Sequence, residues 1–180
     1  MRPCMALGRG AFRLALFAWL GLVSSSALAA TAEAEVKAAY LYKLASFVRW
    51  PGEGGSGSPF TICVAGRSDV ASVLGQLVRG QQVAGRAVAV EQLAAAQSAR
   101  ARDCAVLFVG RGAGSKAFFS AARGLPVLTV GDRNNGTGGG VVDFMLRDGR
   151  VRLAIDRGAA DRQHLELSSK LLDVAVVVTP

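Results

Sequence analysis

One glycine-rich segment has the residue types of a phosphate-binding loop: Gly110-Arg111-Gly112-Ala113-Gly114-Ser115-Lys116. It follows a predicted strand and precedes a predicted helix, and the N–H groups at a helix start attract anions. Its spacing differs from that of a P-loop, and Ser115 stands where the dinucleotide-binding fingerprint has its third glycine. Two interpretations remain open: a flexible turn in which Ser115 caps the helix, or a weak ligand loop formed by Gly110, Gly112, Gly114 and Ser115.

Residues for catalysis or metal binding are sparse. His164 is the single histidine and lies in a polar stretch, which favours a solvated side chain over a general base. A zinc site is not predicted, because the chain has neither a histidine cluster nor a Cys-x-x-Cys pair. The Gly-x-Ser-x-Gly turn of many hydrolases is also absent. We therefore predict a protein that is not an enzyme and uses no cofactor and no metal.

The N-terminus is typical of a secretory signal peptide. Arg2, Arg9 and Arg13 precede an apolar run of about ten residues, which is shorter than the roughly 20 residues of a membrane span. Ala27-Leu28-Ala29 has the small-x-small pattern of a cleavage site. We expect a signal peptide over residues 1–29 and a single periplasmic domain over residues 30–180.

The chain is basic, with a formal net charge of +8. Three of its arginines lie in the predicted signal peptide, so the mature domain would carry about +5. The remaining basic residues are dispersed, and no tight Lys/Arg cluster stands beside stacking aromatic residues. The predicted export of the protein and the dispersed positions of its basic residues together argue against a nucleic acid as partner.

Two of the three cysteines would remain in the mature domain, because Cys4 lies in the signal peptide. Cys63 and Cys104 are an even pair in an oxidising compartment, which favours a disulfide. The bond would close a loop of about 41 residues, which the chain-entropy model values at roughly 4 kcal/mol. Two buried free thiols are the alternative.

Apolar periodicity predicts one long helix followed by alternating strands and helices. The predicted helix covers residues 32–49, and a glycine- and serine-rich loop follows it. Its apolar face consists of Val36, Ala39, Tyr40, Leu44, Phe47 and Val48. Short apolar strands that alternate with helices indicate an α/β fold with a mostly parallel sheet. The predicted strands are 60–65, 87–91, 104–109 and 126–130, and the predicted helices are 70–78, 92–99 and 115–122.

The C-terminal part breaks this alternation with a predicted antiparallel hairpin. Asp148-Gly149 favours a type I′ turn between strands 141–147 and 150–156. A two-residue turn places Leu146 opposite Val151 and Phe144 opposite Leu153, so the apolar residues share one face. A short helix over 159–163 and an apolar tail over 171–178 complete the prediction.

Five segments, taken in order, resemble the YfiR family, a domain of unknown function found in secreted bacterial proteins. The first is an alanine- and aromatic-rich helix that ends in Phe47-x-x-Trp50-Pro51. The segments are 36–51, 60–66, 104–109, 127–132 and the hairpin together with 168–172. The resemblance implies a reduced Rossmann-like sheet with flanking helices. It also implies that Cys63 and Cys104 correspond to one cysteine pair of the family, whereas a second pair near the hairpin is missing here.

The resemblance further implies a regulatory role. It points to a repressor that binds the periplasmic sensor domain of an inner-membrane diguanylate cyclase, keeping cyclic-di-GMP and biofilm formation low. An outer-membrane lipoprotein can sequester such a repressor. Our candidate partner surface is the hairpin and nearby residues, namely Phe144, Leu146, Leu153 and Leu165, with core packing as the alternative for most of them. A periplasmic small-ligand receptor that uses loops 110–115 and 132–140 is the second hypothesis, and a homodimer is left open.

Overall fold

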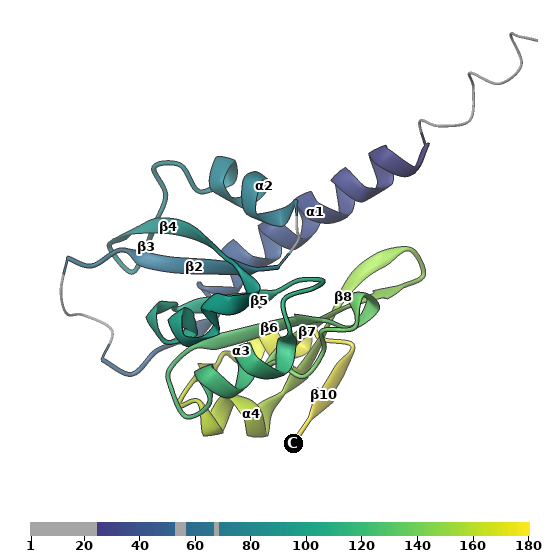
Figure 1. Cartoon of the computed structure of the whole chain (residues 1–180). Coiled ribbons are helices and arrows are strands. Elements are labelled where there is room, and N and C mark those ends of the chain that lie inside the picture. The colour runs from purple at the N-terminus through teal and green to yellow at the C-terminus, as the bar shows by residue number, and fades with distance from the viewer. Residues whose placement is uncertain (1–24, 53–56, 67–68) are drawn as a thin grey trace, which may run out of the picture.

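Short runs of apolar residues form the centre of one curled, mostly parallel sheet (Figure 1). The computed structural model describes residues 25–52, 57–66 and 69–180, and side chains from residue 31 onward. Within these residues the main sheet has eight strands in the order β10-β8-β7-β6-β5-β2-β4-β3. Its strands are β2 (Phe60–Ala65), β3 (Gln82–Val83), β4 (Arg86–Leu93), β5 (Val106–Val109), β6 (Leu128–Asp132), β7 (Val142–Arg147), β8 (Arg150–Asp156) and β10 (Val177–Thr179).

The central strands are buried on both faces, which explains why they are continuously apolar in sequence. Every residue of β5 and β6 is buried, and β2 is buried except at Thr61. Parallel pairing joins β4, β2, β5, β6 and β7 in that spatial order. The predicted strands are confirmed with shifted ends, and so is the α/β fold class with a C-terminal hairpin.

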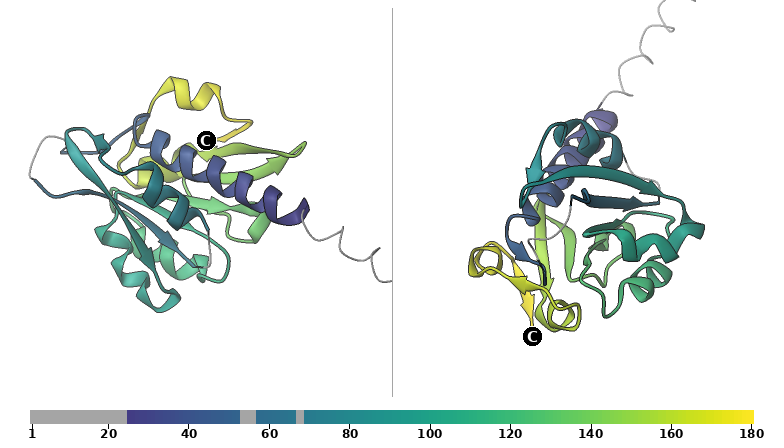
Figure 2. Two further views of the ribbon diagram at one scale, coloured as in Figure 1. Left: turned by 90° about the horizontal axis from the view of Figure 1, so that it is seen from above. Right: turned by 90° about the vertical axis from the view of Figure 1, so that its left-hand side faces the viewer.

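Helices cover both faces of the sheet (Figure 2). On one face lie α1 (Ser25–Leu44) and α2 (Val70–Leu77), whose buried residues join the larger apolar cluster. On the other face η1 (Ala95–Asp103) and α3 (Ser115–Ala122) enclose a second cluster around Phe118. The helix predicted over 92–99 is wrong: β4 continues to the buried Leu93, and the following residues form a 3₁₀ helix.

The first helix ends earlier than the sequence predicts. Helix α1 stops at Leu44, and Val48–Arg49 forms β1, which pairs antiparallel with β9 (Glu166–Leu167). After β1, Trp50 packs edge-on against Phe60, with 5.2 Å between ring centroids. The buried face agrees with the prediction at Leu44 and Val48 but not at Val36 and Phe47, which are exposed. The other buried residues of α1 and the turn after it are Ala34, Lys37, Ala38, Leu41 and Ala45.

The predicted hairpin is confirmed in register. Leu146 pairs with Val151 and Phe144 with Leu153 across β7 and β8. Asp148 and Gly149 have φ values of 51° and 69°, the positive values that a type I′ turn requires. The helices and turns around this part are η2 (Arg133–Asn135), α4 (Arg157–Arg162) and α5 (Ser169–Asp173).

A disulfide joins Cys63 of β2 to Cys104, two residues before β5, as the sequence predicted. Both cysteines are buried within the second apolar cluster, under α3. The bond therefore links two neighbouring central strands on the face opposite α1. The predicted signal peptide lies almost wholly outside the described residues, which begin at Ser25, the first residue of α1.

We predict that Cys63→Ala/Cys104→Ala lowers the free energy of unfolding by roughly 4 kcal/mol, because the unfolded chain loses its 41-residue cross-link. Urea denaturation of the variant and of wild type, with and without reductant, measures the change. Reduced wild type should approach the variant in stability. Finding two titratable thiols in unfolded, non-reduced protein from the periplasm would contradict the bridge.

Candidate functional site

The strand order creates a crevice at the carboxyl edge of the sheet. The chain passes from β2 to β4 on one side of β2, and then to β5 on its other side. The segments that follow β2 and β5 therefore run to opposite faces of the sheet. In open α/β sheets, ligands bind outside the carboxyl ends of the strands at such a switch point.

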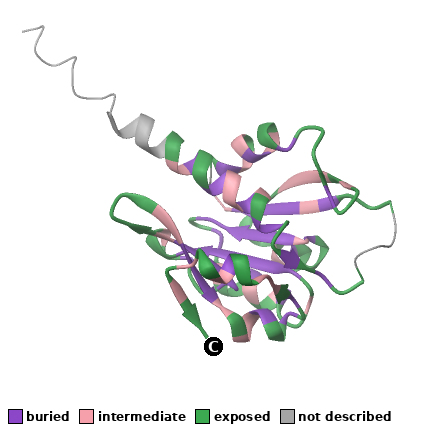
Figure 3. Ribbon diagram, turned by 180° about the vertical axis from the view of Figure 1, so that it is seen from behind, coloured by how far each residue is buried: buried purple, intermediate pink, exposed green. Residues whose placement is uncertain are grey.

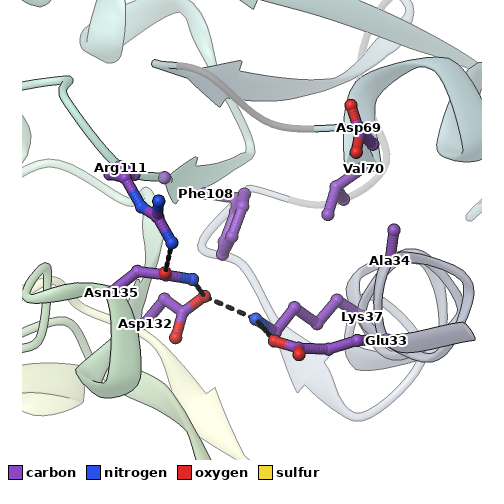
Figure 4. A pocket seen from close by; sticks show the side chains of 10 residues that line it. Glu33, Ala34, Lys37, Asp69, Val70, Phe108, Arg111, Asp132 and Asn135 are labelled. Carbon is purple, nitrogen blue, oxygen red and sulfur yellow. Dashed lines mark hydrogen bonds and ion pairs between the residues drawn. The ribbon is translucent and has the colours of Figure 1, made fainter. Parts of the chain in front are cut away.

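A cavity of about 430 Å³ lies at this point (Figure 4). Helix α1 and the start of α2 form one wall, and the ends of β5 and β6 form the other. Its size falls in the range of small-molecule sites. The residues that line it are Glu33, Ala34, Lys37, Asp69, Val70, Phe108, Gly110, Arg111, Asp132 and Asn135.

A buried ion pair connects the two walls. Lys37 Nζ lies 2.5 Å from Asp132 Oδ2, and their side chains are 7% and 2% exposed. Lys37 also pairs with Glu33, one turn earlier on α1. Small neighbours on the helix, Ala34 and Ala38, leave room for the lysine stem to cross the packed face. The pair thus joins residues 95 positions apart in the sequence.

The backbone around Asp132 is held by Thr137. Asp132 N donates to Thr137 Oγ1 at 3.1 Å, and Thr137 N donates to the Asp132 carbonyl at 3.0 Å. The Thr137 hydroxyl also donates to the carbonyl of Val109, the last residue of β5, at 2.7 Å. One threonine therefore ties together the carboxyl ends of β5 and β6, so this wall of the cavity is preformed.

Hydrogen bonds continue from Asp132 to the rim of the cavity. Asn135 Nδ2 donates to Asp132 Oδ2, and Arg111 Nη2 donates to Asn135 Oδ1, each at 2.7 Å. Figure 4 shows the resulting chain from Glu33 through Lys37 and Asp132 to Arg111. The other carboxylate oxygen, Asp132 Oδ1, is buried without a hydrogen-bond partner. An acceptor in that position favours a positively charged or donor group nearby.

The glycine run 136–140 folds around a carboxylate instead of entering the cavity. Asp143 Oδ1 accepts from the N–H groups of Gly139 and Gly140, both at 3.0 Å. A Cβ atom on Gly131 would lie 2.4 Å from the same oxygen, so this close approach requires glycine. The run is therefore a bonded connector into β7.

The structure divides the glycine-rich segment. Gly110 lines the cavity, whereas Gly112 and Gly114 are exposed outside it and Ser115 lies beyond the rim. Ser115 does not cap α3, because the N-cap position is Gly114, which is left-handed with a φ of 72°. Sequence reasoning missed Lys37 and Glu33, although a lysine four residues after a glutamate within an apolar face was a usable signal.

Most of the predicted partner surface is core. Phe144, Leu153 and Leu165 are 0%, 2% and 3% exposed, so the prediction is wrong for these three. The apolar face of the hairpin packs inward, where the ring of Phe144 meets those of Tyr40 and Phe108 at 6.1 and 5.8 Å between centroids. Leu146 alone of the four remains on the surface, 45% exposed.

Within the described residues, no three His, Cys, Asp or Glu side chains converge as metal ligands. His164 is exposed at the end of α4. None of the described helices is both long and apolar enough to span a bilayer.

A family model described as YfiR/HmsC-like matches residues 34–176. The match begins in α1 and ends just before β10, so it includes both walls of the cavity apart from Glu33, the disulfide and the hairpin. A search of curated proteins found no match.

We predict that Lys37→Met lowers the free energy of unfolding by about 3 to 5 kcal/mol, because it leaves the carboxylate of Asp132 buried without its cation. Lys37→Met combined with Asp132→Asn should cost less than the sum of the single changes, and a double-mutant cycle by urea denaturation measures the difference.

The exposed pair of Arg49 and Glu166 provides the control for this cycle. Its side chains are 75% and 73% exposed at a separation of 3.0 Å, and Arg49→Gln should cost about 1 kcal/mol or less. If Lys37→Met were as mild as Arg49→Gln, the buried pair would not have the structural role given to it here.

Proposed function

The chain belongs to the YfiR/HmsC-like family, and from this we propose that it is a periplasmic repressor that binds an inner-membrane diguanylate cyclase and is not itself an enzyme. The family is one of periplasmic regulatory domains in diguanylate cyclase signalling. The observation that carries the proposal is the extent of the match, residues 34–176, which takes in the whole core. In this proposal the repressor binds the cyclase's periplasmic sensor domain and lowers cyclic-di-GMP and biofilm formation.

Repression of this kind requires only that the repressor binds two states of the sensor domain with different affinities. A sensor domain that exchanges between two states is held in the state that the repressor binds more tightly. The repressor contributes a rigid surface, and the disulfide and the buried ion pair supply that rigidity. An outer-membrane lipoprotein that binds the same repressor would compete with the cyclase and release it.

The tip of the hairpin is the surface that we propose for the cyclase. Asp132 pairs with Phe144, so β7 runs three residues beyond the end of β6 to Arg147, and the tip projects from the sheet (Figure 3). Arg147 and Arg150 face each other across the ribbon, an arrangement of like charges that costs stability. No ion pair compensates either arginine within the described residues. An acidic partner surface with an apolar centre for Leu146 would offset that cost.

A small-ligand receptor without a cyclase partner is the second candidate. The cavity at the switch point favours it, since such positions are where open α/β sheets bind ligands. The two functions are compatible, because a ligand with different affinities for the free and bound repressor changes partner affinity by the same factor.

We predict that deleting the gene raises cyclic-di-GMP and biofilm mass. Expression of the full chain should restore both, whereas expression of residues 30–180 without the predicted signal peptide should not, because the product stays in the cytoplasm. Mass spectrometry of nucleotide extracts measures cyclic-di-GMP. Unchanged cyclic-di-GMP in the deletion strain argues against the proposal.

We predict that Leu146→Asp weakens binding to the cyclase sensor domain by tenfold or more, since it removes an apolar contact and adds a like charge to an acidic surface. Titration calorimetry with the purified sensor domain measures the affinity. Leu77→Asp is the matched control, because Leu77 is 44% exposed on α2 and Leu146 is 45% exposed. Equal affinity of both variants would exclude the hairpin tip.

A further inference from the structure

We propose that the cavity at the switch point binds a small zwitterion whose amino and acid groups are separated by a short apolar chain. This inference goes beyond repression of a cyclase and does not depend on it. It rests on which charges around the cavity are already neutralised, which are not, and what lies between them.

Two opposite charges at the cavity have no ionic partner among the residues that the structure describes. The carboxylate of Asp69, the N-cap residue of α2, makes no capping hydrogen bond and has no ion pair within the described residues. The guanidinium of Arg111 has one bond there, to the neutral amide of Asn135. Both residues are exposed at the rim, and Figure 4 shows them on opposite sides of the cavity.

The remaining charges are paired with one another, one cation with two carboxylates. Lys37 is shared between Glu33 and Asp132 and is 7% exposed, so it is not a free anion-binding cation. The unpartnered Asp132 Oδ1 adds negative potential deeper in the cavity. The lining therefore holds three carboxylates and two cations. That balance disfavours a polyanion such as a nucleotide and leaves one anionic and one cationic anchor at the rim.

Apolar groups lie between the two anchors. Phe108 and Val70 are buried and line the cavity together with Ala34. A chain of methylene groups packs against such a surface, whereas each charged end forms a charge-assisted hydrogen bond. A volume of about 430 Å³ accommodates such a molecule with some water.

The test is titration calorimetry of the oxidised protein with glycine, β-alanine, γ-aminobutyrate and δ-aminovalerate. Putrescine and succinate serve as four-carbon probes with two amino groups or two acid groups. At least one of the amino acids should bind, and about tenfold more tightly than either four-carbon probe. Absence of binding by every amino acid, or equal binding of succinate or putrescine, would overturn the proposal.

Variants at the rim assign the binding to the cavity. Arg111→Gln and Asp69→Asn should each weaken binding by about tenfold or more, because each removes one charged anchor. Asp69→Lys should reverse the preference, so that succinate binds more tightly than γ-aminobutyrate. Arg79→Gln and Asp161→Asn, at exposed positions outside the cavity and the hairpin, are charge-matched controls that should bind as wild type does.

Both rim side chains are exposed, so the variants are expected to fold, and circular dichroism with thiol titration checks that they do. Unchanged affinity in folded Arg111→Gln and Asp69→Asn would place the zwitterion elsewhere on the protein and refute the site. These binding measurements do not depend on cyclic-di-GMP. A negative result would therefore refute the zwitterion site without affecting the proposed repression of a cyclase.

Discussion

The buried pair of Lys37 and Asp132 is the interaction on which the carboxyl edge of this molecule depends. A lysine on the packed face of a helix is tolerated only if a carboxylate meets it, because an unpaired buried charge is very unfavourable. The pair therefore fixes the rotation of α1 about its own axis and the helix's position over β6. Because Lys37 and Asp132 are paired with each other, the charges that the cavity exposes to solvent are those at its rim.

A second constraint acts on the opposite face. The disulfide from Cys63 to Cys104 joins β2 to the segment that leads into β5, the two strands between which the chain changes direction. The two strands that meet at a switch point are not consecutive in the chain, so no short connection holds them together. A covalent bond on one face and an ion pair over the other stabilise the sheet near this point, and the crevice between them keeps a defined shape.

Features that depend on local sequence could be predicted, and features that depend on distant partners could not. The hairpin register follows from Asp148-Gly149 and strict alternation, and the structure reproduces it pair by pair. The end of α1 was misplaced because Val48–Arg49 pairs with Glu166–Leu167, which no local pattern reveals. The partner of Lys37 could not be predicted for the same reason, because Asp132 is 95 residues away, although Glu33 one turn earlier was a local signal for the lysine itself. The burial of Phe144 and Leu153 could not be predicted, because an apolar pattern alone does not say which face of a ribbon meets the core. The burial of Leu165, which lies between α4 and β9, likewise depends on distant partners.

The cavity and the hairpin lie at the same edge of the sheet, because β7 runs parallel to β6 and continues past it. Phe108, which lines the cavity, contacts Phe144 of β7, and Phe144 in turn contacts Tyr40 of α1. A ligand that drew α1 and β5 together would therefore act on the packing that supports the hairpin. By thermodynamic linkage, if a ligand changed the affinity for a partner by some factor, the partner would change the affinity for the ligand by the same factor. The contacts between these rings connect the cavity to the hairpin physically, and that connection does not require a second disulfide.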